Sequence, residues 1–101
     1  MTAGPSSFDA VGPVLETGEV GRAIAEAIQK RHAGAQVLDR GAYLRVFVPG
    51  RCVVRTADVE ELLGRPLDLP GDLERVMPSF KGTLTIDPRG DEIVWAFRER
   101  R

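Results

Sequence analysis

Residues 77–97 read MPSFKGTLTIDPRGDEIVWAF. The pattern predicts a short lead-in, a strand, a tight turn and a second strand. Apolar and polar side chains alternate in 83–86, as they do in strands with one buried face, and in 93–98 the large side chains Ile93, Trp95 and Phe97 alternate with Val94, Ala96 and Arg98. Between them, Asp87-Pro-Arg-Gly90 places Asp first, Pro second and Gly fourth, which a type I turn prefers. The predicted hairpin holds almost no catalytic side chains, which favours a protein that works by presenting a surface.

The start of the chain predicts a tail followed by one domain. Residues 1–8 are small, polar and rich in Pro and Gly, and we expect a flexible tail. Residues 9–101 form the domain, a length typical of a single one. Residues 11–15 read VGPVL and are expected to be extended, with Pro13 confining them to a strand start or a sheet edge.

The first helix has the clearest pattern in the chain. Thr17 is expected to cap it, Glu19 complements the positive helix start, and Gly34 is placed to end it. Glu26 and Lys30 form a favourable i,i+4 pair. One narrow apolar stripe, expected to pack on a sheet, is formed by Val20, Ala23, Ile24, Ala27 and Ile28.

Three strands are predicted in the middle of the chain, at 36–39, 43–48 and 52–55. Leu44, Val46 and Val48 share one face of the second strand, while Tyr43, Arg45 and Phe47 share the other. Pro49-Gly50 predicts a turn, and we expect the last two strands to pair as a hairpin. A three-residue loop would set Arg45 opposite Arg55, a two-residue loop would give another register, and the sequence leaves both open.

Two further helical segments complete the pattern. Thr56 is expected to cap a helix that ends near Leu63, with Gly64 as its stop, and residues 72–77 form one or two helical turns. The order of elements predicts an α+β fold: a compact single domain with small antiparallel β-sheets packed on two or three helices. Two small sheets are more plausible than one wide sheet.

Composition excludes several classes of function. The formal net charge is −1, so the whole chain gives no electrostatic support for a nucleic-acid partner. A single cysteine excludes an internal disulfide, and a single histidine excludes a histidine-rich metal cage. We find no signal peptide and no apolar run of the ~20 residues that a membrane span needs. A cytoplasmic location without membrane attachment is the expectation.

No constellation of residues predicts catalysis. His32 is most simply a partner of a helix end, and Cys52 lies in an apolar strand, where cysteine acts as a small hydrophobe. The phosphate-loop, dinucleotide, C-x-x-C and H-E-x-x-H motifs are absent. We therefore expect no catalytic, cofactor-binding or metal-binding residues. Tyr43 and Phe47 around Arg45 could also imitate a base-stacking platform, although one so small is a weak alternative.

Five segments, in order along most of the chain, resemble the MmoB/DmpM family, the small effector or coupling proteins of bacterial multicomponent diiron monooxygenases. Toluene monooxygenase effectors are the branch that looks most similar. The segments are VGPVL at 11–15, AYLRV at 42–46, EELLGRP at 60–66, MPSFKG at 77–82 and DEIVWAF at 91–97.

The resemblance implies a regulatory component without a cofactor of its own. Family members dock on the diiron hydroxylase and increase turnover, coupling and regiospecificity of hydroxylation. The partner would be the hydroxylase of a toluene- or phenol-type system, and we expect a monomer when the protein is free. Two alternatives remain: a small metabolite-sensing regulatory domain, and an enzyme in its own right.

A basic stretch without acids between Asp39 and Asp58 suggests where a partner would bind. Arginine and aromatic side chains are enriched at the centres of interfaces. The predicted partner-binding residues are Arg40, Tyr43, Arg45, Phe47, Arg51 and Arg55.

Overall fold

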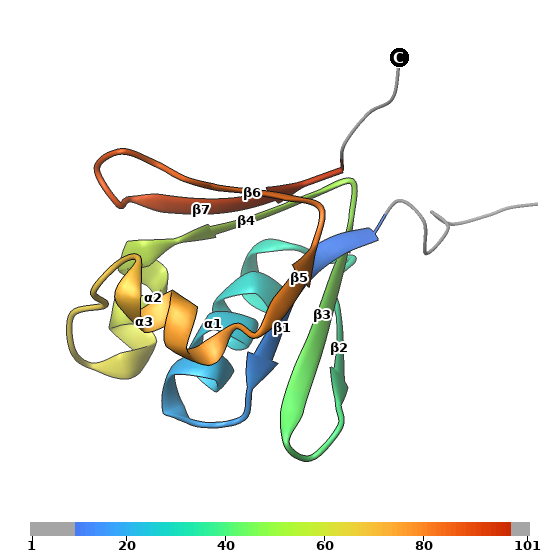
Figure 1. Ribbon diagram of the computed structural model, residues 1–101, viewed down its shortest axis with the longest axis horizontal. Coiled ribbons are helices and arrows are strands. Elements are labelled where there is room, and N and C mark those ends of the chain that lie inside the picture. The colour runs from blue at the N-terminus through green and yellow to red at the C-terminus, as the bar shows by residue number, and fades with distance from the viewer. Residues whose placement is uncertain (1–9, 98–101) are drawn as a thin grey trace, which may run out of the picture.

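The computed structural model describes residues 10–97. The expected tail at residues 1–8 lies outside this range. Three helices fill the corner between two antiparallel sheets (Figure 1), which confirms the predicted α+β class. The elements are β1 (Ala10–Glu16), α1 (Glu19–Arg31), β2 (Gln36–Asp39), β3 (Tyr43–Pro49), β4 (Arg51–Arg55), α2 (Thr56–Leu63), α3 (Gly71–Val76), β5 (Ser79–Lys81), β6 (Thr83–Ile86) and β7 (Glu92–Ala96).

The two sheets share one core. The first has the strand order β2-β3-β1-β5, and the second has the order β4-β7-β6. Helix α1 contacts strands of both sheets and also packs on α2 and α3. Trp95 is fully buried, and its indole N–H has no hydrogen-bond partner among the described residues. The other largest fully buried side chains are Leu15, Ile24, Ile28, Leu73 and Ile93.

The apolar stripe of α1 faces the core as predicted, with Ala23, Ile24, Ala27 and Ile28 buried. The predicted cap was wrong. Gly18 precedes the helix without a side-chain cap, and the Thr17 hydroxyl instead donates to the Gly41 carbonyl at 2.9 Å. The hydroxyl therefore ties the end of β1 to the turn between β2 and β3. The helix also ends earlier than expected, at Arg31 rather than near Gly34.

The C-terminal hairpin has the predicted form. Strands β6 and β7 pair in a register that sets Thr83 opposite Ala96 and Ile86 opposite Ile93. Gly90 closes the turn by donating its N–H to the Asp87 carbonyl at 2.7 Å, and its φ of 75° is one that glycine readily adopts. The turn chemistry read from the sequence is therefore the chemistry that the structure uses.

The predicted hairpin between β3 and β4 was wrong. Strand β3 pairs with β1 and β2, whereas β4 pairs with β7 in the other sheet. The chain turns at Gly50 and changes sheets there. Arg45 lies opposite Val14 and Leu38, and Arg55 lies opposite Glu92. The pairing of Arg45 with Arg55 that a three-residue loop would have given therefore does not occur.

Strand β1 is central rather than at an edge, because it lies between β3 and β5. Its ladder with β3 has no paired residues at Gly12 and Pro13, which accommodates a proline that cannot donate a hydrogen bond. A Cβ on Gly12 would lie 2.4 Å from the Val46 carbonyl oxygen. The two backbones approach so closely that only glycine fits at this position.

Helix α2 follows β4 without an intervening loop. Thr56 is its first residue and not its cap, and its hydroxyl donates to the Gly90 carbonyl in the β6–β7 turn. Gly64 ends the helix in the left-handed conformation, as predicted. Asp72 at the start of α3 is buried and accepts hydrogen bonds from the Asp68 backbone N–H, at 2.7 Å, and from Arg75.

Candidate partner interface

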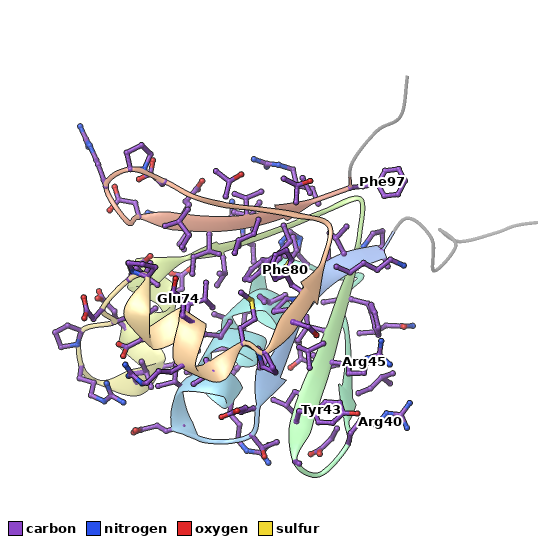
Figure 2. The ribbon with its side chains drawn as sticks, viewed as in Figure 1. Arg40, Tyr43, Arg45, Glu74, Phe80 and Phe97 are labelled. Atoms are coloured by element: carbon purple, nitrogen blue, oxygen red, sulfur yellow. The ribbon has the colours of Figure 1, made fainter. Side chains whose placement is uncertain are left out.

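The four-stranded sheet has one face in the core and one face that no helix covers among the described residues. Leu44, Val46 and Val48 on β3 are buried, as alternation predicts. The opposite side of β3 carries Tyr43, which is 40% exposed, together with Arg45 and Phe47, which are half-buried. Figure 2 shows Arg40 and Arg45 on the side of this sheet away from the helices.

We call this outer surface the open sheet face. Strand pairing shows which side chains belong to it, because directly paired residues project to the same side. Across three neighbouring strands, Leu38, Arg45 and Val14 form one row. The open sheet face is defined here by the outward side chains Val14, Glu16, Gln36, Leu38, Tyr43, Arg45 and Phe47.

Arg45 lies at the centre of this face. Its guanidinium carbon is 5.1 Å from the centroid of the Phe47 ring, a cation–π contact. Val14 and Leu38 flank it on the adjacent strands. Among the described residues Arg45 makes no ion pair and no side-chain hydrogen bond, whereas Arg75 is paired with a carboxylate. The stack therefore holds a guanidinium in place and leaves its donors available.

A hollow of about 100 Å3 lies beside Arg45, where β1, β3 and β5 meet. Val14, Phe47 and Ser79 contribute to its walls. Phe80, which is 43% exposed, also lines it. The walls of this hollow are mixed, because Arg45, Ser79 and Lys81 line it together with the apolar side chains.

The structure divides the six predicted residues between different surfaces. Tyr43, Arg45 and Phe47 lie together on the open sheet face. Arg40 lies next to them, in the turn between β2 and β3, where its backbone N–H donates to the Tyr43 carbonyl. Arg51 and Arg55 belong to the other sheet, at opposite ends of β4, where they pair with Ala96 and Glu92 of β7. The single basic patch expected from the sequence does not form.

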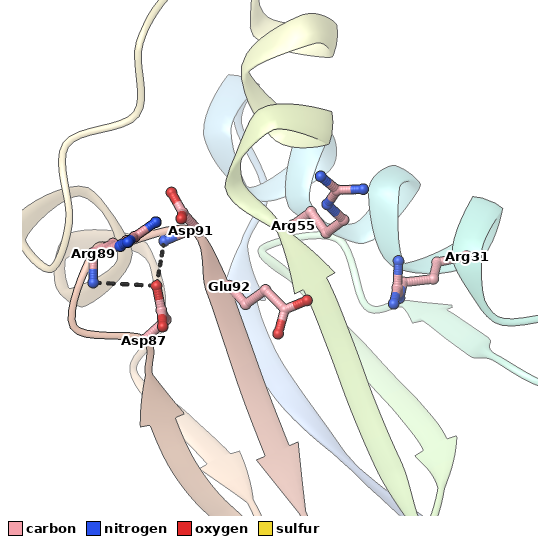
Figure 3. Close-up of a pocket in the computed structure, with 6 residues that line it drawn as sticks. All are labelled: Arg31, Arg55, Asp87, Arg89, Asp91 and Glu92. Atoms are coloured by element: carbon pink, nitrogen blue, oxygen red, sulfur yellow. Dashed lines mark hydrogen bonds between the residues drawn. The ribbon is translucent and has the colours of Figure 1, made fainter.

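Arg55 lines a different hollow, polar and about 430 Å3 in volume (Figure 3). Three arginines and three carboxylates surround it, so its charges balance. The Asp87 carboxylate accepts hydrogen bonds from the backbone N–H groups of Arg89 at 3.1 Å and Asp91 at 3.2 Å. The remaining lining side chains are Arg31, Arg55, Arg89, Asp91 and Glu92. Such a mixed, open rim is typical of a solvated surface.

His32 and Cys52 both have surroundings typical of side chains that stabilise a fold. The His32 Nε2 atom lies 2.9 Å from the Val53 backbone nitrogen and 3.1 Å from its carbonyl oxygen. Burial raises the pKa of the Cys52 thiol to about 12, which disfavours the thiolate that a nucleophile requires. Within residues 10–97 no group of three or more His, Cys, Asp and Glu side chains is placed to hold a metal ion.

Sequence reasoning missed Leu38 and Val14 as members of the site. Leu38 is 41% exposed and lies beside Arg45 on β2. Its exposure could have been inferred, because it alternates with Val37 in a short strand. Val14 carried no such signal, since its place beside Arg45 depends on pairing between segments about thirty residues apart.

In the same described residues, no helix is long and apolar enough to cross a bilayer.

Together, these elements define a small α+β protein with two antiparallel sheets and one exposed sheet face. Residues 9–96 match the MmoB/DmpM family, and the chain belongs to this family.

Relatives agree with this assignment. The "alkene monooxygenase system, effector subunit" of Xanthobacter autotrophicus (strain ATCC BAA-1158 / Py2) is 31% identical over 90 residues, which are 87% of this chain and 86% of that protein. Two solved chains come from structures of a phenol hydroxylase–regulatory protein complex. One is 22% identical with a TM-score of 0.74, covering 88% of this chain and 98% of that one. The other is 24% identical with a TM-score of 0.73, covering 87% and 99%. At these identities the two structures support the fold.

Proposed function

We propose that this protein is the effector component of a bacterial multicomponent monooxygenase. It binds the diiron hydroxylase of its system in the cytoplasm and raises the turnover and the coupling of hydroxylation. The observation that carries the proposal is family membership over residues 9–96, together with 31% identity to an effector subunit. The role is regulatory, and the chemistry takes place on the hydroxylase.

An effector of this kind can act only through a difference in affinity. It must bind one conformation of the hydroxylase more tightly than another, because a ligand with equal affinity for both shifts nothing. A coupling free energy of 1–3 kcal/mol corresponds to about 5–150-fold. This range is the typical change in affinity at one site when the other site is occupied.

The substrate of the system is not fixed by the effector. The sequence favoured a toluene- or phenol-type system, and this remains a prediction. The curated relative belongs to an alkene system, so alkenes join aromatic hydrocarbons as candidate substrates.

Reconstitution tests the proposal. The hydroxylase and electron-transfer proteins of the same monooxygenase system are purified, and product formation and NADH consumption are measured while the chain is titrated in. We expect the rate, and the product formed per NADH, to rise and then saturate. The chain alone should turn over no hydrocarbon. Identical rates and coupling with and without the chain would refute the effector role.

A further inference from the structure

We propose that the open sheet face is the surface that docks on the hydroxylase, and that the hydroxylase presents a carboxylate to Arg45 within an otherwise apolar contact. This inference rests on the proposed function and deepens it. It replaces the dispersed set of arginines that the sequence suggested with one continuous surface.

The apolar character of the face supports docking. Four large hydrophobic side chains are substantially exposed in the described part of the chain, and two of them, Leu38 at 41% and Tyr43 at 40%, lie on this face. A third, Phe80, borders the hollow beside it. Exposed apolar side chains that cluster, rather than scatter, mark interaction surfaces. Covering them removes apolar area from water, which is the main favourable term in association.

The charge of the face defines the partner's chemistry. Arg45 lies on the face and Arg40 borders it in the turn between β2 and β3, whereas Glu16 opposite Tyr43 is the acid among the paired residues of β1 and β3. The face and its bordering turn therefore carry a small positive excess on a chain whose net charge is −1. Complementarity requires carboxylates on the partner.

Arg45 is the anchor because its geometry is fixed before binding. Phe47 beneath it and Leu38 and Val14 beside it restrict the guanidinium, so less conformational entropy is lost when a carboxylate binds. A guanidinium can bind a carboxylate with two parallel hydrogen bonds. Burying that pair at the centre of an apolar patch gives the arrangement of an interface hot spot.

The size of the face suits a specific complex. Strands of four, seven, seven and three residues, at about 4.8 Å spacing and about 3.3 Å per residue, give a projected area of about 330 Å2. A standard interface buries about 800 Å2 of accessible surface on each partner. Side-chain relief and the neighbouring turn add to the projected area, so this face supplies a large part of a standard interface.

Affinity measurements with matched variants test the inference. The probe is the purified hydroxylase of the same monooxygenase system, and dissociation constants are measured by calorimetry at low and moderate salt. Arg45→Ala and Phe47→Ala should each weaken binding about 10–30-fold. Arg45→Gln, which keeps a polar side chain and removes the charge, should flatten the salt dependence. The controls Arg51→Ala and Arg55→Ala lie on the other sheet and should stay within about twofold of wild type.

The outcomes separate this inference from the proposed function. If wild type neither binds nor activates the hydroxylase, the proposed function fails. If wild type activates while the Arg45 and Phe47 variants bind normally, or if Arg51→Ala or Arg55→Ala carries the loss instead, the docking face is wrong and the effector role stands. Thermal melts confirm that each variant is folded. A wild-type dimer that Phe47→Ala dissociates, with hydroxylase affinity unchanged, would assign the face to self-association and overturn the inference.

Discussion

His32 connects the end of α1 to the free edge of β4, and removing it should destabilise the whole fold. Val53 is only 4% exposed, and the His32 Nε2 atom lies 2.9 Å from its backbone nitrogen. In His32→Ala that buried N–H loses its acceptor. An unsatisfied buried backbone group costs about 1–3 kcal/mol. Because His32 is half-buried, water can partly replace it, and we expect a loss of about 1–2 kcal/mol.

Trp95 provides the assay. It is the only tryptophan and is fully buried, so its fluorescence should report urea unfolding directly. His32→Gln is the informative comparison, because its terminal amide oxygen can take the place of Nε2 as an acceptor and should recover part of the loss. Arg31→Ala, at the exposed neighbouring position, is the control and should change stability by less than about 0.5 kcal/mol.

Two outcomes would contradict this role of His32. A wild-type-like urea midpoint for His32→Ala, or equal losses for the Ala and Gln variants, would refute the reasoning.

Three further predictions follow from local geometry. Gly12→Ala brings a Cβ to 2.4 Å from the Val46 carbonyl oxygen and should lower the free energy of unfolding in urea by about 2–4 kcal/mol. The control Gly41→Ala, at a positive φ but with no neighbour within 4 Å, should lower it by about 1 kcal/mol, and similar losses for the two variants would contradict this. Because burial raises the pKa of the Cys52 thiol from 9.0 to about 12, the folded protein should resist alkylation by iodoacetamide until urea is added. The free energy of unfolding should also fall above pH 9.0, where only the unfolded thiol ionises, and rapid alkylation of the folded protein would count against this prediction. The Asp68 N–H lowers the pKa of Asp72 below 3.8, so Asp72→Asn should lower the urea midpoint at neutral pH, and the difference should shrink as acid protonates the native carboxylate; a constant difference would exclude this contribution.

Local patterns in the sequence predicted the elements well, and contacts between distant segments were the part they could not predict. The α1 stripe and the β6–β7 turn depend on spacing within a few residues, and both were confirmed. The β3–β4 hairpin failed because a short turn is compatible with pairing but does not require it. Cys52, Val53 and Val54 are all buried in succession, unlike the alternating residues of β3. An unbroken apolar run of this kind predicts a strand buried on both faces, and it was the available sign that β4 belongs elsewhere.

The candidate site was predicted only in part, because the local pattern of β3 does not show which residues of other strands lie beside it. Alternation within β3 placed Tyr43, Arg45 and Phe47 on one face, and this grouping survives in the structure. Arg51 and Arg55 were added by proximity in sequence, and the change of sheet at Gly50 carries them away from it. The caps at Thr17 and Thr56 failed because each hydroxyl found a distant carbonyl, at Gly41 and Gly90.

The arrangement of the core suggests which partner changes shape in the proposed complex. The opposite face of the same sheet packs on α1 through fully buried side chains such as Ile24 and Leu15. Close-packed interiors resist continuous deformation, so the face should present nearly the same shape before and after docking. The conformational change then belongs to the hydroxylase. Binding linkage is reciprocal, so any hydroxylase ligand whose affinity the effector raises must raise the affinity for the effector by the same factor. If Arg45 makes its contact in only one hydroxylase conformation, Arg45→Ala should weaken binding to that conformation alone and reduce the coupling factor. If Arg45 contacts both equally, the variant should lose affinity while the maximal activation at saturation stays unchanged.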